Sequence, residues 1–127
     1  MKNVLVGVTR HKSGDRLIHY GKEVADGTGG DLFVVHVMKY PLTELTKKSA
    51  EVLEYLHTRA AECNTTLNLI RSTNSVATLV SLVDRLDIGT LVIGETRKDK
   101  PYEDTIQAFL DILCEDCSVI IVPRADT

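Results

Sequence analysis

The amino-acid sequence predicts a doubly wound α/β domain with an open, five-stranded parallel sheet and helices on both faces. Short apolar runs rich in β-branched residues alternate along the chain with longer segments whose apolar residues recur at helical spacing. The resulting order is βαβαβαβαβ, and strands that alternate with helices pair in parallel because each right-handed crossover needs a helix. The chain has 127 residues, 43% of them apolar and 26% charged, as expected of one globular domain.

A strand, a helix and a second strand are expected at the start of the chain. Residues 3–8 (NVLVGV) are apolar and β-branched, as in a strand buried on both faces. Ser13 can cap the helix that follows, with Asp15 in its first turn, and the GTGG cluster at 27–30 ends it. Residues 31–38 (DLFVVHVM) form the second strand. The stripe expected to be buried on this helix comprises Leu17, Ile18, Gly21, Val24 and Ala25.

The middle of the chain predicts two helices on either side of an edge strand. Thr43, which follows Pro41, is the expected N-cap of the second helix, and Asn64 ends that helix. Residues 66–71 (TLNLIR) alternate only in part, which is typical of a strand at the edge of a sheet. The STNS segment at 72–75 caps the third helix. The expected buried stripes are Leu45, Val52, Leu53, Leu56 and Ala60 on the second helix, and Val76, Leu79, Val80, Val83 and Leu86 on the third.

Two further strands and one helix complete the predicted sheet. Residues 89–94 (GTLVIG) form the fourth strand, and residues 118–122 (SVIIV), closed by Pro123, form the fifth. A basic loop and a helix connect them. The side of that helix expected to be buried carries Ile106, Phe109, Leu110, Leu113 and Cys117.

The composition argues against several classes of partner. A net charge of −3 disfavours a general nucleic-acid binder, and a chain with no Trp, two Phe and four Tyr lacks a stacking platform for single strands. No apolar run approaches a membrane span, and the first residues do not resemble a signal peptide. The three cysteines, an odd number, suit a reducing compartment. We therefore expect a cytoplasmic protein with no nucleic-acid and no membrane partner.

Ligands of doubly wound sheets bind beyond the carboxyl ends of the strands, where the strand order reverses. The segments that follow the first, second and fourth strands are Thr9 to Lys12, Met38 to Tyr40 and Gly94 to Lys100. Neither GxxxxGK[ST] nor GxGxxG occurs, so no standard glycine cradle for phosphates is present. Arg97, Lys98 and Lys100 could still hold an anion as point charges, but a solvated basic loop is the favoured interpretation, because lysine is so often exposed.

The cysteines and histidines do not form a catalytic or metal-binding pattern. Cys114 and Cys117 form a CxxC at the C-terminal end of a helix beside two acids, where the local field opposes thiolate formation, so core cysteines are expected. His36 lies within a strand and is expected to be a hydrogen-bonded core residue, whereas His11 lies in a loop at the expected cleft. We therefore expect no catalytic residues, no metal site and no enzyme. The four histidines, which lack metal-ligand spacing, are His11, His19, His36 and His57.

Three segments carry a resemblance to the universal stress protein domain, and the resemblance extends over essentially the whole chain. They are NVLVGVTRHKSGDRLIHYGKEVADGTGGDLFVVHV at 3–37, SVATLVSLVDRLDIGTLVIGETRK at 75–98 and CSVIIVP at 117–123. The second is also similar to the domain of this kind in KdpD-type potassium-sensing histidine kinases. The resemblance implies one domain over residues 1–127, with the fold of universal stress proteins and adenine nucleotide alpha hydrolases and strand order 3-2-1-4-5.

The resemblance also bears on nucleotide binding. Nucleotide-binding members carry an Asp after the first strand and a loop of the form G-x-x-G, nine residues, then G-[ST]. Here those positions are Thr9, Gly94, Arg97 and the pair Gln107-Ala108, so Gly94 alone matches. The side chain of Arg97 keeps the main chain from approaching phosphates closely, so typical ATP binding is not expected. The candidate ligand-binding residues are Val8, Thr9, Arg10, His11, Val37, Met38, Gly94, Arg97, Lys98, Gln107 and Ala108.

The family further implies homodimers built on the last strand, and an apolar edge strand left open agrees with this. The candidate interface is Val119, Ile120, Ile121 and Val122. Our first hypothesis is a non-enzymatic regulatory or stress-response domain that acts through dimerisation and contacts with a signalling protein, without a cofactor. The alternatives are a protein that binds or slowly hydrolyses a nucleotide such as ATP or AMP, and a sensory module for another anion, such as a cyclic dinucleotide in a KdpD-like pathway.

Overall fold

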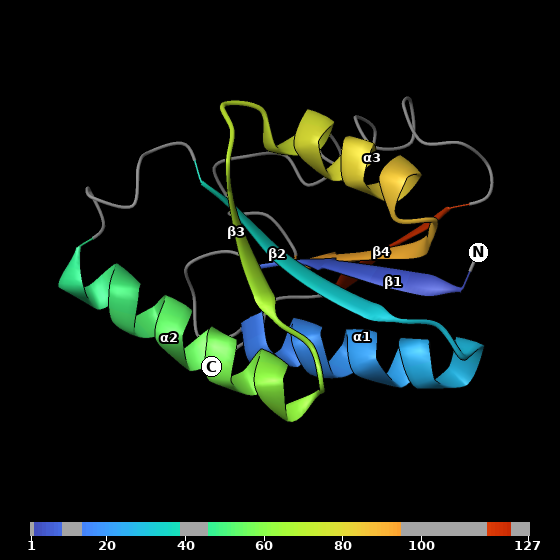
Figure 1. Cartoon of the computed structure of the whole chain (residues 1–127), viewed down its shortest axis with the longest axis horizontal. Helices are drawn as coiled ribbons and strands as arrows, with labels where there is room; N and C mark the ends of the chain where they lie inside the picture. Colours follow the sequence, from blue (N-terminus) through green and yellow to red (C-terminus); the bar gives the residue numbers. More distant parts are fainter. Residues whose placement is uncertain (1, 9–13, 39–45, 95–116, 123–127) are drawn as a thin grey trace.

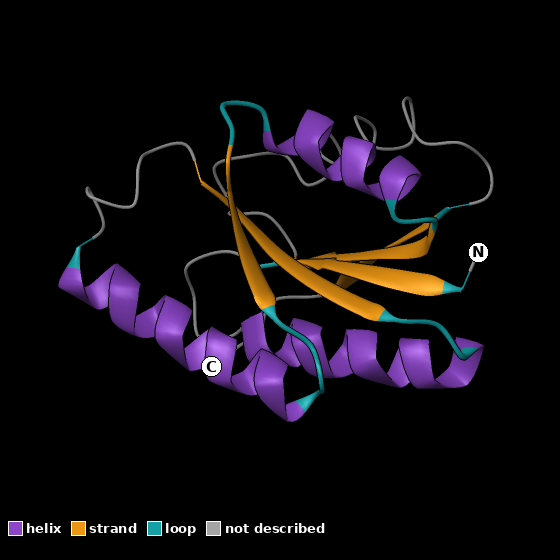
Figure 2. Ribbon diagram, viewed as in Figure 1, coloured by secondary structure: helices purple, strands orange, loops and turns teal. Residues whose placement is uncertain are grey.

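The computed structural model describes residues 2–8, 14–38, 46–94 and 117–122. Its elements are β1 (Asn3–Gly7), α1 (Gly14–Thr28), β2 (Leu32–Met38), α2 (Lys47–Glu62), β3 (Leu67–Arg71), α3 (Ser75–Arg85), β4 (Ile88–Gly94) and β5 (Ser118–Val122). The five strands form one parallel sheet in the order β3-β2-β1-β4-β5, as predicted. Figures 1 and 2 show α3 on one face of the sheet, and α1 and α2 on the other.

The sheet separates two apolar clusters, one on each face. Alternate residues of β1 enter different clusters: Val4 and Val6 face α1 and α2, and Leu5 faces the α3 side. All three are fully buried, as expected of a central parallel strand. The buried stripe predicted for α1 is confirmed, with Val24 only partly buried. On α3, Leu79 and Val83 are buried, and Val76, Val80 and Leu86 pack against them in part.

The start of α2 differs from the prediction. Thr46, not Thr43, is the N-cap, and its hydroxyl accepts a hydrogen bond from the Ser49 amide at 3.1 Å. Thr46 offers the same hydroxyl cap as Thr43 one turn closer to the buried stripe, so the helix begins there. Thr43 and Leu45 lie outside the described residues, while the other stripe residues, Val52, Leu53, Leu56 and Ala60, are buried as predicted.

The remaining helix ends follow the sequence. Asn74 caps α3 by accepting a hydrogen bond from the Ala77 amide at 3.0 Å. Asn64, just after the end of α2, has φ of 59°, a left-handed conformation that asparagine tolerates and that stops a helix. Ser13, Pro123 and the helix predicted between β4 and β5 lie outside the described residues, and of that helix's expected stripe only Cys117 is described.

Side chains tie the amino end of the sheet to the turns that enter it. The side chain of Asn3 makes two hydrogen bonds. Its Nδ2 donates to the Leu86 carbonyl at 2.9 Å, and its Oδ1 accepts from the backbone amide of Asp31 at 2.9 Å. The Thr28 hydroxyl donates to the Lys2 carbonyl at 2.7 Å. These bonds fasten the entries of β1, β2 and β4 to one another.

The GTGG cluster lies at this same amino end, as the sequence predicts. Gly29 has φ of 76°, and both Gly29 and Gly30 donate their amides to the Ala25 carbonyl, which ends α1. A Cβ built on Gly30 would overlap the backbone carbonyl of Lys2. The cluster is therefore a helix stop and a close backbone crossing.

Candidate functional site

The carboxyl ends of β1, β2 and β4 lie side by side. Gly7, the last residue of β1, pairs with Val35 of β2 on one side and with Ile93 of β4 on the other. The chain runs outward from β1 through β2 to β3, then returns to the other flank of β1 with β4 and β5. The strand order therefore reverses between β1 and β4, which is where doubly wound sheets bind their ligands. We call the side of the sheet formed by the carboxyl ends of β1, β2 and β4 the carboxyl edge, or ligand edge.

Four of the predicted ligand-binding residues are described, and all four lie at this edge. Val8 and Met38 are each 3% exposed, so their side chains belong to the core beneath the edge. Val37 and Gly94 are partly exposed. The other predicted residues, which lie outside the described residues, are Thr9, Arg10, His11, Arg97, Lys98, Gln107 and Ala108.

Gly94, the last residue of β4, lies next to Leu17 of α1. A Cβ built on Gly94 would lie 3.4 Å from Cδ1 of Leu17, which is an ordinary van der Waals distance, so packing alone does not require a glycine here. A glycine also leaves the main chain accessible to a phosphate, but the presence of Gly94 by itself does not indicate a ligand.

His36 is buried beneath the same edge, as predicted for a hydrogen-bonded core histidine. It is 5% exposed, and its Nδ1 lies 2.9 Å from the carbonyl oxygen of Val8. Because a carbonyl can only accept, Nδ1 carries the proton. The sequence predicted the bond but not its partner; the signal was a lone imidazole within an otherwise apolar strand.

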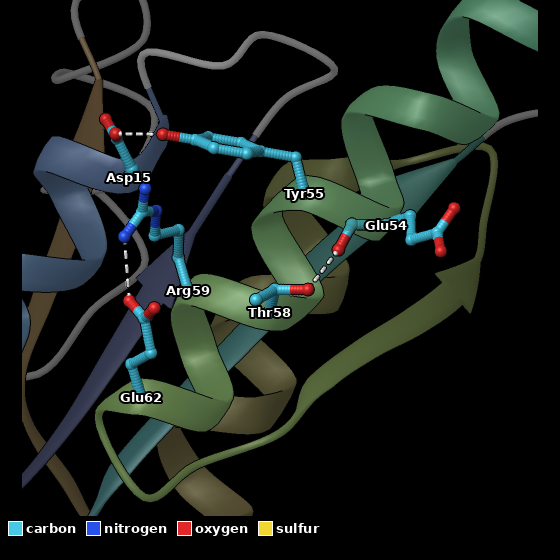
Figure 3. A network of polar contacts seen from close by, with 6 residues as sticks. All are labelled: Asp15, Glu54, Tyr55, Thr58, Arg59 and Glu62. Atoms are coloured by element: carbon cyan, nitrogen blue, oxygen red, sulfur yellow. Dashed lines mark hydrogen bonds and ion pairs between the residues drawn. The ribbon is translucent and has the colours of Figure 1, made fainter.

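A polar network joins the first turn of α1 to α2 (Figure 3). The Tyr55 hydroxyl donates to Oδ2 of Asp15 at 2.7 Å, and the Arg59 guanidinium lies 5.1 Å from the centre of the Tyr55 ring. Arg59 also pairs with Glu62 at 2.9 Å. The Tyr55 side chain, and next the Glu62 carboxylate, raise the pKa of Arg59. The sequence places Asp15 in the first turn of the helix but does not indicate its partner Tyr55, which lies 40 residues away.

A shallow depression of about 350 Å³ adjoins this network and does not coincide with the ends of the strands. Its described lining comes from α2 alone, which makes it an open surface feature of one helix. The carboxyl edge therefore remains the candidate site on grounds of topology. The lining residues of the depression are Glu51, Glu54, Tyr55, Thr58, Arg59 and Glu62.

The two described cysteines, Cys63 and Cys117, pack with the apolar clusters on opposite faces of the sheet. Cys63 is 6% exposed, and burial raises the pKa of its thiol. Cys117 is half-buried and packs against the cluster on the α3 side, in agreement with a core role, while Cys114 lies outside the described residues. Within the described ranges, no group of three histidine, cysteine or acidic side chains is placed to hold a metal ion, and no helix is long and apolar enough to cross a membrane.

The predicted dimer strand lies at the edge of the sheet. Among the described strands, β5 pairs only with β4, from Thr90–Ser118 to Gly94–Val122. Val122 is buried, and the other three candidate interface residues, Val119, Ile120 and Ile121, are half-buried. The edge position of this apolar strand is thus confirmed, and its pairing with a second copy stays a prediction.

Comparison with known proteins supports the resemblance through the fold. No family model and no curated protein sequence matches the chain. A universal stress protein solved in complex with cAMP has a TM-score of 0.69 at 17% identity, with 97% of each chain covered. One from Lactobacillus plantarum has a TM-score of 0.69 at 14% identity, covering 94% of this chain and 96% of its own. One from Archaeoglobus fulgidus in complex with dAMP has a TM-score of 0.64 at 16% identity, covering 94% and 95%.

The chain therefore has the parallel α/β fold of universal stress proteins. At these identities the likeness establishes the fold and not the ligand. The closer similarity of residues 75–98 to KdpD-type kinases stays a prediction.

Proposed function

We propose that this chain, given its universal stress protein fold, is a regulatory domain of that kind, spanning residues 1–127, which acts by binding and partner contacts rather than by catalysis. One observation carries the proposal: the described residues at the ligand edge are Val8, Val37, Met38 and Gly94. The two that are partly exposed, Val37 and Gly94, offer main chain and one apolar side chain, which suit the binding of a flat organic group. None of the four residues supplies a nucleophile or an acid–base pair.

A second candidate function is the sensing of a nucleotide at this edge. Two proteins of the same fold were solved with cAMP and with dAMP, and both ligands are adenine nucleotides with a single phosphate group. The chain departs from the ATP-binding pattern at Thr9, Arg97, Gln107 and Ala108. A guanidinium at residue 97 favours a small anion held by charge over a triphosphate held by main-chain amides. AMP, cAMP and cyclic dinucleotides are therefore the ligands to test first. A cyclic dinucleotide is the ligand expected if the chain is a sensory module in a KdpD-like pathway.

A thermal-shift panel tests both candidates. A ligand present at 100 times its Kd stabilises the native state by about 2.7 kcal/mol, a rise in Tm of roughly 10 °C for a domain of this size. We expect no such rise with ATP and Mg²⁺. A rise with AMP, dAMP, cAMP or a cyclic dinucleotide selects the second candidate and identifies its ligand. Mass spectrometry of small molecules released from gently purified protein extends the panel to ligands that do not exchange.

The clearest contrary result is an ATP-dependent rise in Tm that disappears in Arg97→Ala. The matched control is Arg85→Ala, since Arg85 is exposed at the end of α3 and lies away from the ligand edge. Release of phosphate from ATP by wild type, again abolished by Arg97→Ala and kept by Arg85→Ala, would replace a binding role with an enzymatic one.

We further propose that β5 pairs with its counterpart in a two-fold homodimer, because it is an apolar edge strand. Light scattering after size exclusion should give the mass of a dimer. Ile120→Lys should shift that mass towards a monomer, whereas Leu69→Lys, on the opposite edge strand, should not. Circular dichroism verifies that both variants fold. A monomeric wild type, or an equal effect of the two substitutions, would contradict the dimer.

A further inference from the structure

His36 is the one polar or charged residue in the buried class within the described parts of the chain. Burying an imidazole costs free energy unless the ring is hydrogen-bonded, so its retention in an apolar strand calls for a local reason. That reason lies in its partner. The ring reaches the Val8 carbonyl, at the point where the chain leaves β1 for the ligand edge.

Val8 lies one residue beyond the last paired residue of β1. Its amide donates to the Val35 carbonyl at 2.9 Å, and its carbonyl accepts from His36 Nδ1 at 2.9 Å. Both backbone polar groups of Val8 are therefore tied to β2, one by main chain and one by a side chain. The imidazole thus extends the constraint of the sheet to a carbonyl beyond the paired residues.

We propose that His36 is a positioning residue for the candidate ligand site. A peptide unit is planar, so a hydrogen bond that holds the Val8 carbonyl also sets the plane of the unit that leaves β1. The orientation of the main chain as it leaves β1 decides which backbone groups face a ligand at this edge. That link to a ligand rests on the proposed function, whereas the hydrogen bond from His36 to the Val8 carbonyl does not.

Asparagine and leucine at position 36 form a matched pair that separates the hydrogen bond from side-chain volume. The two side chains share a branched outline, and the asparagine amide nitrogen is attached to Cγ, as Nδ1 is in histidine. His36→Asn therefore keeps a donor near the Val8 carbonyl, and His36→Leu removes it. Asn68→Leu is the control for location, because the Asn68 side-chain amide donates to the carbonyls of Val34 in β2 and of Thr66, just before β3, away from the carboxyl edge.

The first measurement needs no ligand. In amide NMR spectra of the full chain, His36→Leu should shift the resonances of residues 9–11, His36→Asn should restore most of each shift, and Asn68→Leu should leave them in place. In wild type, the ring nitrogen spectra should show Nδ1 protonated. If His36→Leu and His36→Asn move residues 9–11 equally, or if neither moves them, His36 is a packing residue only and the proposal is overturned.

The second measurement uses whichever of AMP, cAMP or cyclic dinucleotide raises the Tm of wild type. We expect about tenfold weaker binding by His36→Leu, the size of effect of one lost hydrogen bond, and near wild-type binding by His36→Asn and Asn68→Leu. Equal affinities across the three variants would overturn the link from His36 to the ligand. If none of these nucleotides binds wild type, the nucleotide function fails, and the NMR comparison still decides whether His36 sets the exit from β1.

Discussion

The two ends of the sheet are held in different ways. At the amino end, Asn3 and Thr28 bond to backbone groups of neighbouring segments, and Gly30 lets the Lys2 carbonyl approach closely. At the carboxyl end, His36 bonds to the Val8 carbonyl and Tyr55 to Asp15. The amino-end contacts join the segments that lead into β1, β2 and β4. The carboxyl-end contacts instead orient segments that lead to and from the ligand edge.

This difference separates stability from binding within one small domain. A glycine cluster can hold a phosphate or can let two backbone segments cross closely, and its position in the sheet decides which. Here the cluster lies at the amino end, where ligands of this fold do not bind. Substitutions at the amino end should therefore lower stability and leave any ligand response intact. Substitutions at the carboxyl end should cost less stability, and those at the ligand edge should change the ligand response.

The largest effect on stability is expected for Gly30→Ala. Its new Cβ would overlap the Lys2 backbone carbonyl, which cannot move aside by a rotamer change, so we expect a loss of about 2–4 kcal/mol in a urea titration. Gly27→Ala is the matched control. Gly27 lies within α1, a Cβ there meets nothing within 4 Å, and the change should stabilise by about 0.5–1 kcal/mol. Equal stability of the two variants would refute a close crossing at Gly30.

The next effect is expected for Asn3→Ala, which removes a donor to Leu86 and an acceptor for the Asp31 amide. We expect a loss of about 1–3 kcal/mol in the same titration, because the bond to the Leu86 carbonyl is partly buried and the bond from the exposed Asp31 amide is lost with it. Asn3→Asp keeps the acceptor and should fall between Asn3→Ala and wild type. A change in ligand response by Asn3→Ala, in excess of its change in stability, would contradict the division between the two ends.

A smaller effect is expected at the carboxyl end for Tyr55→Phe. The variant loses the hydroxyl that bonds to Asp15, and we expect a cost of about 1 kcal/mol. A double-mutant cycle with Asp15→Ala, which removes the acceptor, should recover most of this value as coupling. Tyr20→Phe, at an exposed tyrosine of α1, is the control and should be neutral. An absence of coupling would show that the contact does not stabilise the fold.

The smallest effect is a pH dependence at Cys63, which follows the end of α2. Burial raises the pKa of this thiol in the folded protein, so the native state holds the proton more tightly than the unfolded chain does. The associated stability is complete below the ordinary value of 9.0 and is lost as the pH rises through the raised value. Urea midpoints should therefore fall more between pH 8 and pH 10 for wild type than for Cys63→Ala. Identical slopes would contradict the raised pKa.

The sequence predicted the sheet well because its signals are local. The apolar runs predicted the strands to within a residue or two at each end. Asn64 ends α2 through its left-handed backbone conformation, and Asn74, in the STNS segment, caps α3 through its side chain. The strand order came from the family resemblance. Thr43 failed as a helix start because two threonines offer the same cap, and only packing of the stripe behind them selects Thr46.

The site was less predictable because its contacts join distant segments. His36 and Val8 are 28 residues apart, and Tyr55 and Asp15 are 40 apart, so each pair meets only once the elements are docked. Residue types and spacing along the chain cannot specify such partners. The sequence did locate the edge where the ends of β1, β2 and β4 meet, since that follows from topology alone.

β1 pairs with two strands that the ribosome makes at different times. β1 pairs on one flank with β2, starting at Val4 and Leu32, and on the other with β4, starting at Asn3 and Ile88. The first flank can close early, but the second must wait until residues 88–94 emerge. We expect the nascent chain to expose an apolar half-sheet with an open edge during that interval, which makes it a substrate for chaperones that bind extended apolar segments.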